Sequence, residues 1–354
     1  MIFLFIYLYK RLTESFKKLI DNLWPDNYHN LSKNSNNYYY ATYDFKNKIS
    51  YMNPLFQVVQ ANDGKDLVNF IIMTLHDELN EKQNQNNTNN NIQGNQNNKK
   101  LMLKNFMDAF RNENYSIIIN LFYGVVYSMD KCSNCLLCKY NYQVYFFLYF
   151  PLEEIRKYKL EELQKQNMMM EPMNMMIKSI GQNKMNSIQM NQQEFQNNLI
   201  KINLLKNNSV DIFDCFDYEQ RILNFTGENA MYCNTCENCF PATSQEKLYY
   251  GPKILILALN RGGRGIQFKV KLQFSLELDL TNYIENKTSG CIYDLFGVVT
   301  HMDEGSNGHF IASCKSPVDN KWYQYNDDLV YPINNFKEEI LDVAMPYILF
   351  YKKK

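Results

Sequence analysis

Cysteine is missing from a long opening stretch of this 354-residue sequence, because the first one is Cys132. The whole chain has only four histidines and two tryptophans. A thiol nucleophile ahead of residue 132 is therefore excluded. The few histidines also limit the positions from which an imidazole base can act on a thiol.

Excess charge of either sign is also missing, since Lys+Arg and Asp+Glu are equal at 37 each. No global field therefore points to nucleic acid or to an anionic membrane, and we expect neither as a partner. The apolar opening Met1–Tyr9 is far short of the roughly 20 residues that a membrane span needs. It has no basic segment or cleavage site of a signal peptide, so we interpret it as a truncated helix or a mispredicted start.

The nine cysteines include two clusters with metal-ligand spacing. Cys132 and Cys135 form one C-x-x-C pair, and Cys233 and Cys236 form another. Two such thiolate pairs complete a tetrahedral four-sulfur site, which is closed and structural when it holds zinc. We predict one zinc here, with disulfides or free thiols as the alternative. Metal thiolates in place of disulfides indicate a reducing compartment, cytoplasmic or nuclear.

The two pairs are 97 residues apart, which is too far for a free-standing zinc ribbon and fits a ribbon at the end of long strands. Each pair has a third cysteine three residues on, Cys138 and Cys239, which we expect to be spare or alternative ligands. The isolated Cys215, Cys291 and Cys314 are more typical of core residues than of chemistry.

One predicted strand begins with a histidine, and the next predicted strand ends on an amide. Gly308-His309 opens the alternating run Phe310 to Ala312, and Trp322 to Tyr325 ends on Asn326 and Asp327. A hairpin of these strands would place His309 beside Asn326 or Asp327. An imidazole held in one tautomer by such a group is the base half of a Cys-His-Asn/Asp system, although a structural histidine is the better explanation of an isolated Gly-His pair.

The region from Pro252 to Tyr351 resembles the C-terminal half of a ubiquitin-specific protease. The matching blocks, in the family's order, are Pro252–Arg261, Leu278–Ile284, Tyr293–Val299, the Gly308-His309 pair and Tyr347–Tyr351. The resemblance implies an α+β, papain-like fold with a helical thumb, a β-rich palm and zinc-tipped fingers, N-terminally incomplete here. It also implies a deubiquitinating thiol isopeptidase acting on ubiquitin and ubiquitinated proteins.

The family pattern also implies roles for individual residues. His309 matches the general base, Asn326 matches the group that orients it, and Asp327 is positioned to take over that task. Asp63 and Asp66 lie where the family's acids face the arginines of the ubiquitin tail. Both acids also have a local explanation, because they open a predicted helix over residues 67–81 and suit its unpaired amides and dipole.

We expect one domain over residues 1–354, with a thumb at about 10–130 and fingers and palm at about 131–354. Residues 82–100 and 164–205 are rich in Asn, Gln, Lys and Met. This composition predicts two surface insertions without packed structure.

The family's Gly-Asn-Thr-Cys-type box, which supplies the nucleophile ahead of the region around Asp63, has no counterpart in this sequence. The chain is then either an incomplete one or an inactive ubiquitin-binding relative, and an unrelated zinc-ribbon scaffold is a weaker third possibility. We favour an incomplete N-terminus, because the whole box is missing while His309, Asn326 and Asp327 are present. In either case the chain as written should not hydrolyse ubiquitin.

Overall fold

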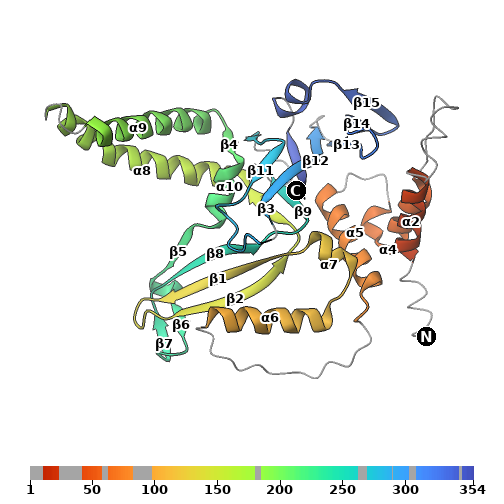
Figure 1. The fold of residues 1–354 in the computed structure, drawn as a ribbon, viewed down its shortest axis with the longest axis horizontal. Helices are drawn as coiled ribbons and strands as arrows, with labels where there is room; N and C mark the ends of the chain where they lie inside the picture. Colours follow the sequence, from red (N-terminus) through yellow and green to blue (C-terminus); the bar gives the residue numbers. More distant parts are fainter. Residues whose placement is uncertain are drawn as a thin grey trace. The chain divides into compact units, whose positions relative to one another are not determined.

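The structure is a computed structural model that describes residues 11–23, 42–57, 63–82, 98–179, 185–261, 269–288, 290–302, 308–342 and 345–354. The chain divides into two compact units. The first comprises residues 1–93, 104–123 and 303–309, and the second comprises residues 94–103, 124–302 and 310–354. Figure 1 gives the element labels used below.

The first unit is helical. Its elements are α2 (Arg11–Leu23), α4 (Tyr43–Met52), the short 3-10 helix η1 (Pro54–Phe56), α5 (Gly64–Leu79), the later part of α6 (Lys99–Glu113) and α7 (Ile117–Phe122). Helix α5 is in the middle, because it packs against both α2 and α7. Its buried Ile72 and Leu75 are three positions apart and so lie on one helix face.

Polar side chains of α5 fasten the neighbouring helices. The Glu78 carboxylate accepts from the amides of Leu12 at 3.2 Å and Thr13 at 2.7 Å, which satisfies unpaired donors at the start of α2. The buried His76 lies between Ser116 Oγ, 2.9 Å from Nδ1, and Asn114 Oδ1, 3.3 Å from Nε2. Sequence reasoning missed this histidine, whose contacts fix the start of α7.

The second unit is built on β-sheets. A four-stranded sheet has the order β2-β1-β8-β5, and a larger sheet has the order β15-β14-β13-β12-β16-β9-β3 with β11 beside β12. Two short pairs, β10-β4 and β6-β7, complete the described strands. The strands are β1 (Gly124–Cys132), β2 (Cys138–Tyr145), β3 (Leu148–Pro151), β4 (Ser209–Asp211), β5 (Ile222–Phe225), β6 (Met231–Cys233), β7 (Asn238–Phe240), β8 (Ala242–Tyr250), β9 (Ile254–Asn260), β10 (Lys271–Gln273), β11 (Glu277–Asp279), β12 (Ile292–Met302), β13 (His309–Lys315), β14 (Trp322–Asn326), β15 (Leu329–Ile333) and β16 (Pro346–Lys353).

Six helical segments accompany these sheets in the part of the chain that the structure describes: the start of α6, α8 (Leu152–Ser179), α9 (Met185–Lys206), α10 (Ile212–Glu219) and two single turns, η2 (Gly227–Asn229) and η3 (Lys337–Leu341). Lys99, the first residue of α6, fixes that helix end on β1. Its Nζ lies 4.2 Å from the centre of the Tyr127 ring and 2.7 Å from Glu285 Oε1.

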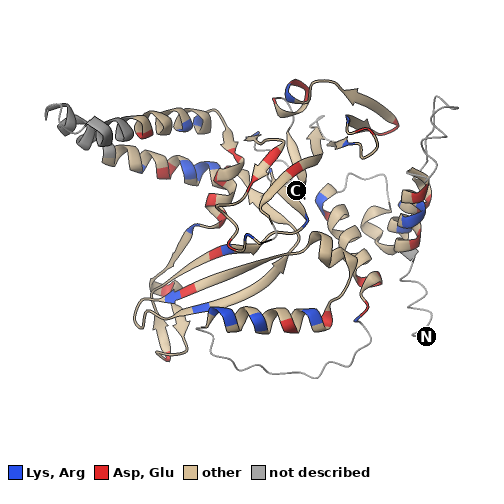
Figure 2. Cartoon of the chain, in the orientation of Figure 1, with Lys and Arg blue, Asp and Glu red and all other residues tan. Residues whose placement is uncertain are grey.

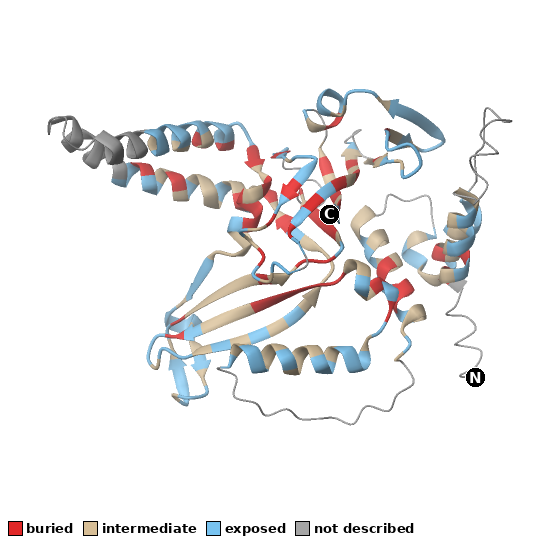
Figure 3. Cartoon of the chain, viewed as in Figure 1, coloured by how far each residue is buried: buried red, intermediate tan, exposed pale blue. Residues whose placement is uncertain are grey.

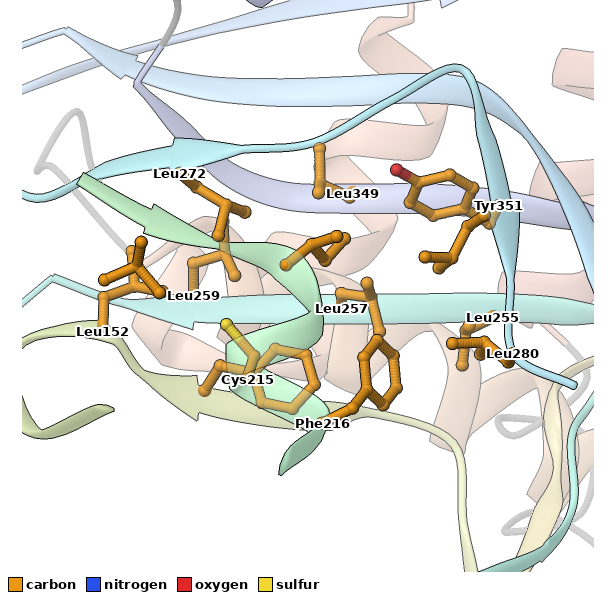
Figure 4. Packing of buried hydrophobic residues seen from close by; sticks show 14 of the residues in the cluster. Leu152, Cys215, Phe216, Leu255, Leu257, Leu259, Leu272, Leu280, Leu349 and Tyr351 are labelled. Atoms are coloured by element: carbon orange, nitrogen blue, oxygen red, sulfur yellow. The ribbon is translucent and has the colours of Figure 1, made fainter. Parts of the chain in front are cut away.

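The core of this unit lies around β9, whose residues from Leu255 to Leu259 are all at most 1% exposed. A continuous apolar run of this kind is expected of a strand that is covered on both faces. Phe216 and Cys215 of α10 pack on one side of it in Figure 4, with Leu349 and Tyr351 of β16 also close to β9. The large sheet is therefore a rigid support for the ends of β13 and β14.

The structure differs from the sequence-based expectation over residues 164–205, where composition predicted no packed structure. Helices α8 and α9 pack against each other, and Ile202 and Leu205 are buried in the core. Figure 3 shows buried positions on both of these helices. The prediction was wrong because a few apolar residues at helical spacing anchor the ends of a segment whose average composition is polar.

Residues 142–151 contribute to two strands, β2 and β3, which belong to different sheets and are separated at Phe146-Phe147. The Met1–Tyr9 segment and residues 83–97 of the first insertion lie outside the described residues. Among the residues that are described, no helix is long and apolar enough to cross a membrane.

Candidate functional site

The two C-x-x-C pairs occupy the turns of two hairpins. Cys132 ends β1 and Cys135 lies in the turn before β2, while Cys233 ends β6 and Cys236 lies in the turn before β7. Pairing of β1 with β8 brings the first hairpin to the chain that follows the second, since Cys132 is opposite Ala242. A hydrogen bond from Ser133 N to Pro241 O at 2.9 Å adds a further link.

The four sulfurs form one compact group. All four Sγ atoms lie within 4.8 Å of one another, and those of Cys135 and Cys233 are 3.6 Å apart. A tetrahedral zinc site with bonds of about 2.3 Å requires sulfurs about 3.8 Å apart, whereas a disulfide requires about 2.05 Å. The predicted four cysteines are therefore brought together in a group that could hold a metal ion.

The backbone supports this geometry in the same way in both turns. The residue after each second cysteine is left-handed, with φ of 61° at Leu136 and 51° at Glu237. A non-glycine residue rarely adopts this conformation, so the repeated occurrence indicates that both turns are shaped to aim their sulfurs at one point. Cys138 begins β2 and Cys239 lies within β7, outside the four-sulfur group.

Thiol pKa values are shifted in both directions within the four-sulfur group. The Leu137 N–H lowers the pKa of Cys135, but burial and the neighbouring sulfurs outweigh it and raise that pKa to about 12. Backbone N–H donation from Cys236 lowers the pKa of Cys233 to about 7. Burial raises the pKa of Cys215, of Cys291 and of Cys314, the last to about 11. A raised thiol pKa leaves little thiolate at neutral pH, so these three cysteines are poor nucleophiles.

His309 and Asn326 lie at the ends of neighbouring strands. His309 begins β13 and Asn326 ends β14, and the strands pair antiparallel, with Ala312 opposite Tyr325. The hairpin predicted from the sequence is therefore present. His301, at the end of β12, packs against the Phe310 ring with 4.7 Å between centroids.

Asp327 has a backbone role. Asn326 pairs with Leu329, so Asp327 and Asp328 form a two-residue turn between β14 and β15. Asp327 has φ of 53°, a left-handed conformation that Asp tolerates better than most residues. The structure thus separates the two candidates, because Asn326 is the last strand residue and Asp327 is the first residue of the turn.

Arg261, which directly follows β9, is almost completely buried. Its Nε donates to Pro346 O at 2.7 Å and its Nη1 to Val270 O at 2.5 Å. Burial lowers the pKa of this guanidinium to about 10. Arg261 therefore ties the end of β9 to the start of β16, and its role is one of support.

Asp63 and Asp66 both lie at the start of α5. Asp63 is the N-cap, and its Oδ1 accepts from Lys65 N at 2.8 Å, while Asp66 is in the first turn. The structure therefore bears out the local explanation for Asp63. It places Asp66 in the first helical turn, where its charge suits the helix dipole.

Substitutions of Asp63 and of Asp66 should have different effects on stability. Asp63→Ala removes the cap and should lower the free energy of unfolding by about 1 kcal/mol in urea titrations. Asp66→Asn keeps a polar side chain and should change stability by less than about 0.5 kcal/mol. Equal loss of stability in Asp63→Ala and Asp66→Asn would contradict the assignment.

A pair of carboxylates that sequence reasoning missed lines a small cleft in the second unit. Glu219 ends α10 and Glu246 lies in β8, and both line a cleft with Phe150 and Phe216. Burial, followed by the charge of Glu246, raises the pKa of Glu219 to about 7, although Arg221 acts in the opposite direction. Burial also raises the pKa of Glu246.

This pair predicts a pH dependence of stability. A carboxyl whose pKa is raised in the fold costs stability as pH rises from its unfolded pKa, about 4.3, through about 7. Glu219→Gln removes this cost, so its unfolding free energy relative to the parent should increase between pH 5 and pH 8. The exposed Glu228→Gln is the control and should show no such trend. A flat difference for Glu219→Gln would refute the raised pKa.

The family model described as "Ubiquitin carboxyl-terminal hydrolase" matches residues 7–351. Ubiquitin carboxyl-terminal hydrolase Usp2 of Drosophila melanogaster is 23% identical over 351 residues, which cover 97% of this chain and 30% of the relative. Ubiquitin carboxyl-terminal hydrolase 12 of Saccharomyces cerevisiae is 30% identical over 170 residues, which cover 46% of this chain and 13% of the relative. Ubiquitin carboxyl-terminal hydrolase 2 of Gallus gallus is 28% identical over 148 residues, which cover 40% of this chain and 41% of the relative. The chain thus spans less than half the length of these relatives.

The solved structures that match this chain have a similar fold. The SAGA DUB module of Ubp8, Sgf11, Sus1 and Sgf73 bound to monoubiquitin matches with a TM-score of 0.61 and 17% identity, over 98% of this chain and 59% of that one. The same module bound to ubiquitin aldehyde matches with a TM-score of 0.58. The fold is therefore the α+β, papain-like fold expected from the sequence.

Proposed function

The chain belongs to the ubiquitin carboxyl-terminal hydrolase family, and from that membership we propose that it is the ubiquitin-recognising domain of a cysteine-type deubiquitinase. The reaction is thiol hydrolysis of the isopeptide bond that follows the last glycine of ubiquitin. The observation that carries the proposal beyond the family match is the β13–β14 hairpin, which holds His309 at one strand start and Asn326 at the neighbouring strand end.

In this mechanism His309 takes the proton of the attacking thiol and later gives it to the leaving lysine amine. Asn326 orients the imidazole and holds its tautomer. Asp327, fixed in the turn beside Asn326, stabilises the imidazolium or substitutes for Asn326. His309 begins β13 and Asn326 ends β14, and the antiparallel pairing of these two strands supports this assignment.

We propose that the four-sulfur group binds one structural zinc through Cys132, Cys135, Cys233 and Cys236. The sulfur spacing and the two matched turns support zinc, which prefers four thiolates in a closed tetrahedron. When bound, the ion links the β1–β2 hairpin to the β6–β7 hairpin and has no open position for chemistry.

The nine cysteines favour a second candidate, a non-catalytic ubiquitin-binding module. Four of them form the metal group, and burial raises the pKa of three others. Cys138 and Cys239 belong to the β-strands next to the metal group. None of these positions is a helix start beside His309, where a thiol nucleophile is needed.

The proposal includes further features that follow from the family. Residues 1–354 form one domain, with a thumb at about 10–130 and fingers and palm at about 131–354. Ubiquitin and ubiquitinated proteins are the partners, Asp63 and Asp66 contact the ubiquitin tail, and the protein works in the cytoplasm or nucleus. Nucleic acid and membranes are not partners.

Two assays on the chain as given test the proposal. Calorimetric titration should detect weak ubiquitin binding, and a ubiquitin probe with a thiol-reactive C-terminus should leave all nine cysteines unlabelled. Absence of ubiquitin binding would refute both candidate functions. Labelling that depends on His309 would show that one of the present cysteines is the nucleophile.

A further inference from the structure

The four cysteines of the metal group differ in their exposure to solvent. Cys132 is 7% exposed, whereas Cys135, Cys233 and Cys236 are partly exposed. Leu136, which follows Cys135 in the turn before β2, is 64% exposed, so this turn lies at the surface of the second unit. A small oxidant can therefore approach three of the four cysteines without unfolding of the two hairpins.

Few charges surround these cysteines. The turn from Cys132 to Cys138 contains no charged residue, and the β6–β7 hairpin, Met231–Phe240, contains only Glu237. This hairpin is accordingly mostly tan in Figure 2. An anionic oxidant finds no cation in these two segments that would draw it to the sulfurs. The uncharged hydrogen peroxide is therefore the class of oxidant that suits the group.

Two of the sulfurs already approach each other across the two hairpins. The Sγ atoms of Cys135 and Cys233 are 3.6 Å apart, and a disulfide bond needs a further approach of about 1.5 Å. The other two cysteines have additional restraints. Cys132 belongs to β1, which is paired on both sides, and Cys236 Sγ accepts from Asn134 Nδ2 at 3.3 Å. These contacts favour a disulfide between Cys135 and Cys233.

We propose that hydrogen peroxide oxidises Cys135 and Cys233 to a disulfide and thereby releases the zinc. This chemistry rests on the proposed zinc, which keeps the four sulfurs deprotonated and so reactive. After oxidation only Cys132 and Cys236 remain as thiolates, whereas a closed structural site needs four ligands. The four-sulfur group is then both a metal site and an oxidation site.

The oxidation takes place in two steps. One thiolate attacks a peroxide oxygen, the O–O bond breaks, and the departing hydroxide takes up a proton to give water, which leaves a sulfenic acid. The second thiolate attacks the sulfur of that sulfenic acid. The S–S bond forms as the S–O bond breaks, and the hydroxide lost there also becomes water. Each sulfur gives up one electron, and the peroxide accepts both.

The position of this disulfide decides what happens to the hairpins. Cys135 and Cys233 belong to different hairpins, so their disulfide keeps the β1–β2 and β6–β7 hairpins joined after the zinc leaves. A disulfide between Cys132 and Cys135 would leave the hairpins unconnected. Because the hairpins stay together, a thiol reductant and zinc should restore the original group, and the oxidation is a reversible switch.

The full chain, purified with its zinc, tests the proposal directly. Hydrogen peroxide should release about one zinc per chain to a chromogenic chelator, and peroxide pretreated with catalase should release none. After alkylation of the remaining thiols, peptide mass spectrometry should identify Cys135–Cys233 as the main disulfide. Dithiothreitol followed by added zinc should return the metal content to about one zinc per chain.

Cys138→Ser with Cys239→Ser is the matched variant, because it removes the two neighbouring cysteines outside the four-sulfur group. It should release zinc at the parent rate and form the same disulfide. A main disulfide within either C-x-x-C pair, or one that includes Cys138 or Cys239, would overturn the proposal.

The metal readout separates this proposal from the zinc assignment on which it rests. Zinc that is present in the untreated chain and unaffected by peroxide, or that is released without any disulfide, would contradict only the oxidation. An untreated chain without zinc would contradict the metal assignment, and the oxidation with it.

Discussion

A variant with both Cys132→Ser and Cys233→Ser should lose its zinc and the order of both hairpins. Each substitution removes one ligand from a different hairpin, so neither half retains a complete thiolate pair. Structural zinc sites contribute roughly 10–16 kcal/mol of apparent binding free energy in small zinc domains. Elemental analysis should find about one zinc per parent chain and close to none in the variant.

The chain offers a matched control for this experiment. Cys138→Ser with Cys239→Ser changes two cysteines of the same hairpins that lie outside the four-sulfur group, and it should retain the metal. Hydrogen exchange should speed up in β1, β2, β6 and β7 of the first variant only. Full zinc retention in the Cys132/Cys233 variant would eliminate the assignment.

The second large effect concerns His309 and requires a chain to which the family's Cys box has been added ahead of the first helix. That chain should react with the thiol-reactive ubiquitin probe and cleave a ubiquitin conjugate. His309→Ala should then lower kcat/KM by at least about 10³-fold, because the thiol loses its base. Asn326→Ala should lower it less, since Asp327 is adjacent in the turn.

His301→Ala is the control for this series. His301 packs on the Phe310 ring and takes no part in the proposed chemistry, so turnover should stay within severalfold of the parent. A rate that does not respond to His309→Ala would exclude the hairpin as the active site. A larger loss for Asp327→Ala than for Asn326→Ala would reverse their roles.

Local patterns explain what could be predicted from the sequence. The cysteine pairs are set by spacing within four residues, and the structure brings Cys132, Cys135, Cys233 and Cys236 together as predicted. The Pro252–Arg261 block, which contains the strand β9, was identified by its resemblance to the family. Alternation from Phe310 to Ala312 predicted β13, and Asp63 was identified as a cap because the N-cap pattern is local.

Contacts between distant residues explain what could not be predicted. Glu78 caps α2 from 65 residues away, and no spacing rule connects them. Glu219 and Glu246 meet only because α10 and β8 line one cleft. Composition averaged over residues 164–205 concealed the few apolar positions, such as Ile202 and Leu205, that anchor α9.

The edge strand β15 has a consequence for behaviour at high concentration. It lies at the end of the eight-stranded sheet, and Leu329, Val330 and Tyr331 are each about half exposed. An exposed apolar edge invites pairing with another chain and aggregation. Pro332 removes one backbone donor from this five-residue strand, which leaves few groups for an incoming strand. We therefore expect Pro332→Val to lower the concentration at which the protein precipitates, with little change in its unfolding free energy.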